Sequence, residues 1–370
     1  MTVQFTAGVG DDFPAVFAEP QRGLVSPRRA RTPVAAVAFA RRTGTIRFMF
    51  PTTIVGSLPK PDWLAETEKL WPAWRLSGEE LRRGKERAAA EWLREQEQAG
   101  IDIVTDGEQF RMHFVHGFLE GIVGIDWNRK TRMGIRNNRY EAEVPTVVGP
   151  LERPAPVHVS DAAFLRAQTT QRLKFTLPGP MTICDTIANA YYPSRADMAM
   201  RFAELLNAEA RDLEAAGVDV IQFDEPAFNV FLDEVRDWGL PALERALQGL
   251  KARTVVHICY GYGIDANIQW KATLGDAWRQ YETIFPWLNR SSVHAVSLEF
   301  AGSKVPHDVL RKLPDKELLV GVVEVLPGKL ETPEEVAANI ALALRHVERE
   351  RLSPCTNCGM APLPEELARG

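Results

Sequence analysis

Short apolar runs alternate with amphipathic helical segments along most of this chain, from Thr52 onward. The runs are nearly continuous in Val, Ile, Leu and Phe, which is typical of strands buried on both faces of a parallel sheet. Eight runs occur, at residues 52–57, 101–108, 174–180, 218–227, 254–261, 295–300, 318–325 and 353–360. Strands that alternate with helices in this way predict an α/β fold, a (β/α)8 TIM barrel.

Three of the segments between the runs carry clear helix start signals. These are a Ser77/Glu80 capping box in residues 76–100, a Ser194 cap in residues 194–217, and a Thr332 cap followed by Pro333 in residues 332–350. The first two segments end at a glycine, as helices commonly do.

The interval between the second and third predicted strands is longer than a minimal barrel requires. It contains GIRNNRYEAEVPTVVG, whose Asn137-Asn138 pair is a turn signal. We therefore expect a β-hairpin insertion that extends over the mouth of the barrel. The sequence ends at LPEELARG, where an eighth helix is expected to begin, so either the chain is truncated or a partner covers that edge.

Residues 1–48 differ from the rest of the chain. They are rich in Arg, Ala and Pro, show no sustained period and contain no apolar core of a secretory signal. We expect a disordered or non-native N-terminal extension before a natural start at Met49, and a single barrel over residues 49–370. An ordered arm packed on the barrel is the alternative.

Composition narrows the class of protein. A net charge of -5 over 370 residues gives no reason to expect a nucleic-acid or membrane partner. Four cysteines in this length do not form a disulfide framework, which favours a reducing cytoplasm. No apolar run approaches the roughly 20 residues of a membrane-spanning helix.

Polar residues stand at or near the ends of most predicted strands, and four of them form a ligand set. His257, Cys259, Glu299 and Cys358 lie in the segments TVVHICYG, AVSLEF and SPCTNCGM. The carboxyl ends of barrel strands meet at one face, and residues i and i+2 of a strand point the same way. An imidazole, two thiolates and a carboxylate favour a tetrahedral Zn²⁺ ion. Cys355 competes with Cys358 for this role, since CTNC resembles a CxxC pair; we favour Cys358.

A second group of strand-end residues suits an amino acid. Gly56 and Ser57 allow backbone N–H groups to approach a carboxylate. Glu108 and Asp224 offer carboxylates for an ammonium group, although a helix cap or a solvated loop is the alternative for each. Together with a sulfur bound to zinc, these contacts indicate a substrate that is an amino-acid thiol. His113 and His116 are spaced to bind a metal on a helix, but packed or solvated histidines are the preferred interpretation.

The motifs IVGSLPKP, VTDGEQ, LPGPMT, IQFDEPA, VHICYG, SLEF and CTNCGMAPL occur here in this order. From about Thr52 to the C-terminus they resemble the catalytic barrel of cobalamin-independent methionine synthase (MetE). The chain is similar to short core members that lack the N-terminal barrel, above all the folate-independent branch called MesD. The resemblance implies a zinc-dependent methyltransferase that converts homocysteine to methionine. It also implies that Val55 joins Gly56, Ser57, Glu108 and Asp224 in binding homocysteine.

Two departures from the family pattern concern the methyl donor. Thr186 stands where folate-using members carry a tryptophan that stacks on the pterin, and Leu326 stands where they carry a proton-donating histidine. These departures favour a donor other than methyltetrahydrofolate. The resemblance to the folate-independent branch further implies a separate accessory protein and a need for oxygen. The alternatives are a folate-using enzyme, zinc-dependent alkyl transfer to another thiol such as coenzyme M, and a zinc-stabilised binding subunit without turnover.

Overall fold

The structure, a computed structural model, describes residues 50–66, 73–261, 265–326 and 328–370. All described residues belong to one compact unit, residues 48–370. The expectation for residues 1–48 lies outside the described residues.

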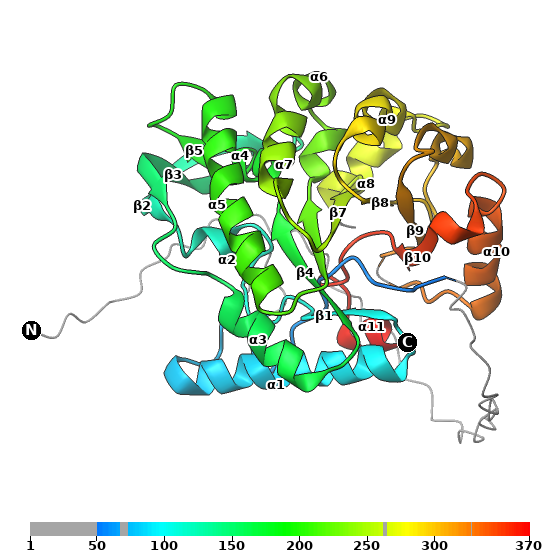
Figure 1. The fold of residues 1–370 in the computed structure, drawn as a ribbon, viewed down its shortest axis with the longest axis horizontal. Coiled ribbons are helices and arrows are strands. Elements are labelled where there is room, and N and C mark those ends of the chain that lie inside the picture. Colours follow the sequence, from blue (N-terminus) through cyan, green and yellow to red (C-terminus); the bar gives the residue numbers. More distant parts are fainter. Residues whose placement is uncertain (1–49, 67–72, 262–264, 327) are drawn as a thin grey trace, which may run out of the picture. The chain divides into compact units, whose positions relative to one another are not determined.

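A seven-stranded parallel sheet forms the centre of the molecule (Figure 1). Its strands follow one another in the order β1-β4-β6-β7-β8-β9-β10. They are β1 (Ile103–Thr105), β4 (Arg172–Pro178), β6 (Val220–Asp224), β7 (Arg253–Ile258), β8 (Ala295–Leu298), β9 (Glu317–Val323) and β10 (Leu352–Thr356). Each coincides with one of the apolar runs, so seven of the eight predicted strands are confirmed.

The first predicted strand, residues 52–57, contacts both edges of this sheet without forming a regular strand. Thr53 makes a single parallel bridge with Ile103 of β1, and its N–H donates to the Pro354 carbonyl of β10 at 3.3 Å. The Val55 N–H donates to the Thr356 hydroxyl at 3.0 Å instead of to a backbone carbonyl, which interrupts the ladder. The α/β fold with a curled, barrel-like parallel sheet is confirmed, whereas the described residues form seven regular strands of this sheet and not the eight predicted.

One layer of small apolar side chains fills the inside of the sheet. It takes one residue from segment 52–57 and one from each of six strands: Val55, Ile103, Val220, Val255, Ala295, Leu319 and Cys355. The fully buried Lys174 of β4 lies beside this layer and donates to the Ile54 carbonyl and to Gln222 Oε1. A larger apolar cluster packs the other side of the sheet against the helices.

Helices cover the outside of the sheet (Figure 1). The longer ones are α1 (Gly78–Gln98), α3 (Val159–Gln168), α5 (Arg195–Ala215), α7 (Leu240–Leu247), α8 (Asp265–Ala272), α9 (Gln280–Arg290) and α10 (Pro333–Ala343). The short ones are α2 (His116–Leu119), α4 (Pro180–Cys184), α6 (Leu232–Glu234) and α11 (Glu365–Arg369). 3-10 turns occur at Pro226–Asn229, His307–Lys312 and Arg349–Arg351, and a π turn occurs at Val235–Gly239.

The helix start signals are confirmed in two of three cases. The Ser194 side chain accepts a hydrogen bond from the Asp197 N–H, and Thr332 forms a complete capping box with Glu335. The predicted Ser77/Glu80 box is wrong, because the Ser77 side chain makes no capping hydrogen bond. Gly78 enters α1 with a φ of 54°, a left-handed conformation that is unlike an ordinary first helical residue.

The predicted hairpin is confirmed. β2 (Val123–Ile135) pairs antiparallel with β3 (Tyr140–Glu152), and β5 (Ala188–Asn189) extends this second sheet. Asn137 and Asn138 form the turn with φ of 54° and 61°, a region that asparagine tolerates. On one side of the tip Arg136 pairs with Asp185 after α4, and on the other Arg139 stacks over Trp270 of α8. The hairpin tip is therefore anchored to the segments that follow β4 and β7.

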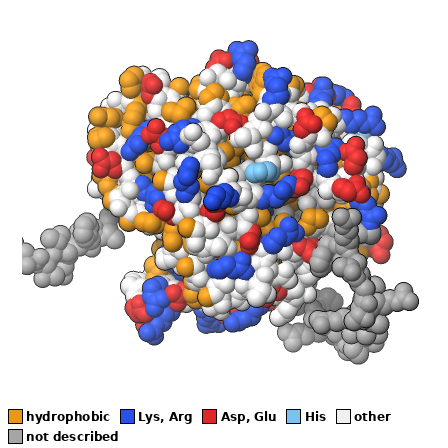
Figure 2. Space-filling model, in the orientation of Figure 1, with side chains coloured by type: hydrophobic (Ala, Val, Ile, Leu, Met, Phe, Trp, Pro, Cys, Tyr) orange, Lys and Arg blue, Asp and Glu red, His pale blue; other side chains and the backbone are white. Residues whose placement is uncertain are grey.

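The last described helix, α11, lies where the eighth helix was expected to begin. Arg369 pairs with Glu95 of α1, and its guanidinium lies 4.4 Å from the Trp92 ring centroid. Among the described residues, no helix is both long and apolar enough to cross a membrane. On the face drawn in Figure 2, basic and acidic side chains are interspersed.

Candidate active site

Three of the four predicted metal ligands lie together at the carboxyl ends of the strands. His257 belongs to β7, Cys259 follows that strand directly, and Cys358 follows β10. Their ligand atoms all lie within 4.8 Å of one another, and the two sulfur atoms are 3.6 Å apart. All three side chains are buried. Residues about a hundred positions apart thus form one compact site.

The two cysteines of the cluster differ in pKa, which favours a Cys259 thiolate beside a Cys358 thiol. The hydrogen bond from Cys358 and the neighbouring His257 hold the pKa of Cys259 well below its usual range, against the effect of burial. The pKa of Cys358 is raised, first because it donates that hydrogen bond and then by burial. Burial alone lowers the pKa of His257, but the Cys259 thiolate beside it raises the pKa above its ordinary value.

These residues fit a zinc ion. Two sulfur ligands at about 2.3 Å from a tetrahedral ion lie roughly 3.8 Å apart, close to the separation found here. His257 Nδ1 lies 2.9 Å from the Ser297 hydroxyl, while Nε2 is buried and has no hydrogen-bond partner in the described structure. A buried nitrogen without a partner is costly unless something binds it. Nε2, Cys259 and Cys358 therefore supply three ligands of suitable type.

Glu299, the fourth predicted ligand, lies next to the cluster and is held by other groups. Its Oε1 pairs with Lys271 of α8 at 2.7 Å, and its Oε2 accepts the Tyr260 N–H at 2.8 Å. Burial raises its pKa, and Lys271 acts in the opposite direction. Glu299 is not one of the three residues whose ligand atoms lie within 4.8 Å of each other.

The two cysteines of CTNC occupy different places. Cys355 lies in β10 and belongs to the apolar layer inside the sheet, whereas Cys358 belongs to the cluster with His257 and Cys259. Burial raises the pKa of Cys355, which keeps it a thiol. The structure therefore places only Cys358 of this pair at the candidate metal site.

Gly56 and Glu108 lie side by side at the same face of the sheet. A Cβ on Gly56 would lie 2.7 Å from Thr176 Cγ2 and 3.4 Å from Glu108 Oε1, so only glycine fits without movement. Glu108 has a left-handed φ of 58° and accepts a hydrogen bond from the Thr176 hydroxyl at 3.0 Å. Its carboxylate is buried, and burial raises its pKa. The hydroxyl of Ser57 is also buried and has no partner in the described structure.

Gln222 connects Val55 to Asp224. Its side-chain amide donates to the Val55 carbonyl at 2.8 Å and to Asp224 Oδ1 at 2.7 Å. Asp224 pairs in register with His257 across β6 and β7, which places the carboxylate next to the cluster of His257, Cys259 and Cys358. Burial raises the pKa of Asp224 to about 7, against the opposing effect of His257. The five predicted substrate residues thus lie at the same strand ends as the cluster.

The two carboxylates of the DEPA motif have separate roles. Glu225 accepts hydrogen bonds from the Met181 and Thr182 N–H groups and from the Thr182 hydroxyl, so it caps the first turn of α4. The capping alternative therefore holds for Glu225 and not for Asp224. His116 is buried against Trp127, and burial lowers its pKa to about 4. This packing agrees with the preferred interpretation of His116 as a packed histidine.

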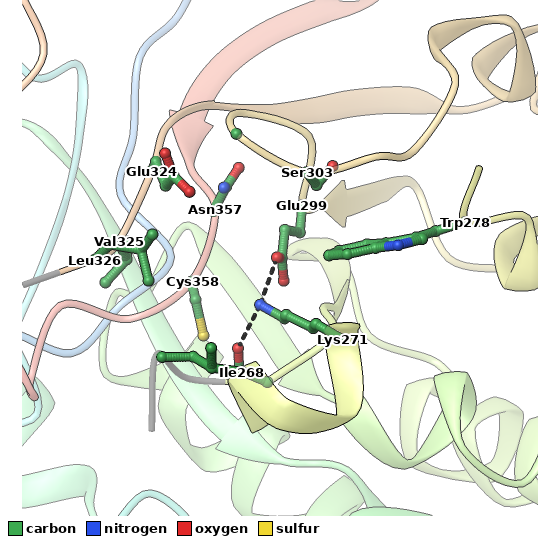
Figure 3. Close-up of a pocket in the computed structure, with 12 residues that line it drawn as sticks. Ile268, Lys271, Trp278, Glu299, Ser303, Glu324, Val325, Leu326, Asn357 and Cys358 are labelled. Atoms are coloured by element: carbon green, nitrogen blue, oxygen red, sulfur yellow. Dashed lines mark hydrogen bonds and ion pairs between the residues drawn. The ribbon is translucent and has the colours of Figure 1, made fainter. Parts of the chain in front are cut away.

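A pocket of about 150 Å³ opens beside the cluster (Figure 3). Cys358, Glu299 and Lys271 line one part of it, and Trp278 and Leu326 line another. The pocket gives a small molecule access to the Cys358 sulfur.

Comparison with known proteins decides the family. The family described as "Cobalamin-independent synthase, Catalytic domain" matches residues 50–370. This chain belongs to that family. A methionine synthase of Sulfurisphaera tokodaii is 32% identical over 321 residues, which cover 86% of this chain and 88% of that protein. A methionine synthase of Saccharolobus solfataricus is 33% identical over 324 residues, which cover 86% and 91%.

Solved structures agree. A B12-independent methionine synthase from Shewanella sp. W3-18-1, in complex with selenomethionine, has 55% sequence identity and a TM-score of 0.85; the match covers 87% of this chain and 94% of that one. A putative vitamin-B12-independent methionine synthase from Listeria monocytogenes, with 19% identity and a TM-score of 0.63, shares the fold. This chain is accordingly an enzyme, a methyltransferase of the methionine synthase type.

Sequence reasoning missed two polar residues that hold the predicted ligands of this synthase. Ser297 lies in β8, two residues before Glu299, so the period of a strand places both side chains on the same side of the sheet. Because β8 lies next to β7, this spacing could have indicated that Ser297 contacts His257. Lys271 lies in a helix after β7, and no motif of the sequence marks it.

Proposed function

We propose that this synthase binds Zn²⁺ through His257, Cys259 and Cys358, with Glu299 as a fourth ligand, and methylates the thiol of homocysteine to give methionine. The arrangement of the cluster carries the proposal: two sulfurs 3.6 Å apart and a buried, unpartnered imidazole nitrogen. The relative from Shewanella sp. W3-18-1 supports it as well, since selenomethionine is the selenium analogue of the proposed product.

The amino-acid part of homocysteine would bind at the neighbouring strand ends. Glu108 and Asp224 supply carboxylates for the ammonium group, and desolvation makes each charge pair stronger than it is in water. The Ser57 hydroxyl, which is buried and has no partner in the described structure, would bind the carboxylate together with the backbone at Val55 and Gly56. The register of Asp224 with His257 sets the distance between the ammonium site and the sulfur site.

The chemical step is displacement of a methyl group by sulfur. When bound, Zn²⁺ lowers the pKa of the substrate thiol so that the thiolate is present at neutral pH. His257 and the two cysteines hold the sulfur acceptor in place, and Asp224 and Glu108 fix the other end of the molecule. The thiolate lone pair forms the new S–C bond as the bond between the methyl group and its carrier breaks, and the carrier keeps the electrons of that broken bond. Alignment of these two bonds is the main contribution of the protein.

We propose a methyl donor other than methyltetrahydrofolate. Thr186 is buried, and its hydroxyl donates to the Thr182 and Ile183 carbonyls, so it offers no aromatic face to a pterin. Leu326 lines the pocket and supplies no proton. We also propose that a separate accessory protein takes part in the reaction. The catalytic unit is proposed to be residues 49–370.

Rescue of a methionine-auxotrophic cell tests this function. We expect growth on homocysteine when folate methylation is blocked, provided that the accessory protein is supplied. The Cys358→Ala variant should abolish growth, and Cys355→Ala should retain it because Cys355 lies inside the sheet. Growth that depends on methylfolate would assign the folate-using reaction. Growth that survives Cys358→Ala would overturn the zinc site.

A further inference from the structure

Lys271 and Glu299 form the one close ion pair next to the metal cluster among the described residues. Their charged atoms are 2.7 Å apart, and the side chains are only 17% and 6% exposed. Lys271 Nζ also donates to the Gly261 carbonyl at 3.2 Å, which fixes the ammonium group over the connection between β7 and α8 (Figure 3). The pair is therefore shielded from the solvent that weakens surface ion pairs.

Donors from α8 and from the residue after Cys259 hold the two oxygens of Glu299. Oε1 pairs with Lys271, and Oε2 accepts the N–H of Tyr260, the residue that follows Cys259. A carboxylate held by two donors, one in α8 and one just after β7, has a defined position beside the cluster.

We propose that Lys271 is a positioning residue that makes Glu299 an exchangeable ligand. This inference rests on the proposed zinc site. Glu299 has two alternative partners, the metal and the Lys271 ammonium group. With zinc bound, Glu299 would move to Lys271 when the substrate sulfur enters, so that one anionic ligand would replace another. The displaced carboxylate keeps a cationic partner in a buried place, where an unpaired charge is costly.

The local charges support this role. Cys358 and Glu299 both line the pocket, Cys259 Sγ lies 3.6 Å from Cys358 Sγ, and the Lys271 ammonium group is 2.7 Å from Glu299 Oε1. Lys271 is the cation that lines the pocket beside them. Removing its charge should leave Glu299 with the metal as its main partner and make entry of another anion harder.

The test compares Lys271→Met with a matched control. Lys329→Met is the control, because it removes a second lysine of similar kind. Lys329 Nζ lies 2.8 Å from Oε2 of Glu324, which lines the same pocket. Zinc affinity is measured by competition with a chelator. The cobalt-substituted protein is then titrated with homocysteine, and its visible spectrum reports ligand exchange. We expect Lys271→Met to bind zinc about tenfold more tightly than the wild type and to need about tenfold more homocysteine for the spectral change. Lys329→Met and Lys271→Arg should be close to the wild type in both measurements.

A double-mutant cycle with Glu299→Gln separates this role from a structural one. In the Glu299→Gln background, Lys271→Met should leave zinc affinity unchanged, since the carboxylate that it controls is gone. Unchanged or weaker zinc binding by Lys271→Met, or an equal effect in the Glu299→Gln background, would overturn the inference while leaving the zinc site intact. A wild-type protein that binds no zinc would overturn the proposed function and this inference together.

Discussion

The Ser297 hydroxyl lies 2.9 Å from His257 Nδ1, so Nε2 is the ring nitrogen left for a metal. Hydrogen bonds to the second nitrogen of a ligating histidine fix its orientation and increase its basicity. The neighbouring strands β7 and β8 impose this arrangement, because His257 and Ser297 are register partners.

Replacing Ser297 by alanine should therefore weaken zinc binding about tenfold, since losses of this kind commonly reach ten- to a hundredfold. Chelator competition measures the change. Ser297→Thr keeps the hydroxyl and is the matched control, with affinity near that of the wild type. Equal affinity of Ser297→Ala and the wild type would show that the hydroxyl does not support the histidine.

Glu108 tests the ammonium site. Glu108→Gln removes the charge but keeps the shape, and we expect KM for homocysteine to rise about tenfold to a hundredfold, because a hydrogen bond to a charged group contributes roughly 1.5–3 kcal/mol. Steady-state kinetics measure it, with Glu120→Gln on the exposed end of α2 as the control. A fall in kcat with unchanged KM would argue against an ammonium contact.

Lys60 predicts a pH dependence of stability. Burial lowers the pKa of this lysine to about 8, against the opposing effect of Glu108, while its pKa in the unfolded chain is near 10.5. Between these values the unfolded chain binds more protons, so the free energy of unfolding rises with pH from about 8 to 10.5. The wild type should gain on the order of 2 kcal/mol over this range relative to Lys60→Met. Denaturant titrations of both proteins measure it, and parallel pH profiles would refute the assignment.

The N-terminal extension yields a separate prediction. A chain that starts at Met49 retains all described residues, and the family match begins at residue 50. We expect its zinc content and methionine formation to equal those of the full chain. Loss of either property on truncation would favour the ordered-arm alternative for residues 1–48.

The strand ends were predictable from the sequence for a physical reason. When strands alternate with helices, the strands of the sheet all run in the same direction. Residues at their carboxyl ends therefore meet at one face of the sheet, even when they are far apart in the chain. His257, Cys259 and Cys358 come together in this way. The distinction between Cys355 and Cys358 also followed from strand position.

Local pairings were less predictable. The Lys271–Glu299 ion pair depends on how α8 folds back over the strand ends, and no period in the sequence encodes that path. The Ser77/Glu80 box failed because a left-handed Gly78 changes the entry into α1. Segment 52–57 has the composition of a strand, but one of its backbone N–H groups, that of Val55, goes to a side chain.

X-ray absorption at the zinc edge, with and without homocysteine, tests the central claim most directly, because it needs neither the methyl donor nor an accessory protein. We predict two sulfur ligands at about 2.3 Å in the resting protein, from Cys259 and Cys358, and three after homocysteine is added. A sulfur count that stays at two with homocysteine bound, or a protein without zinc, would contradict a zinc-held thiolate.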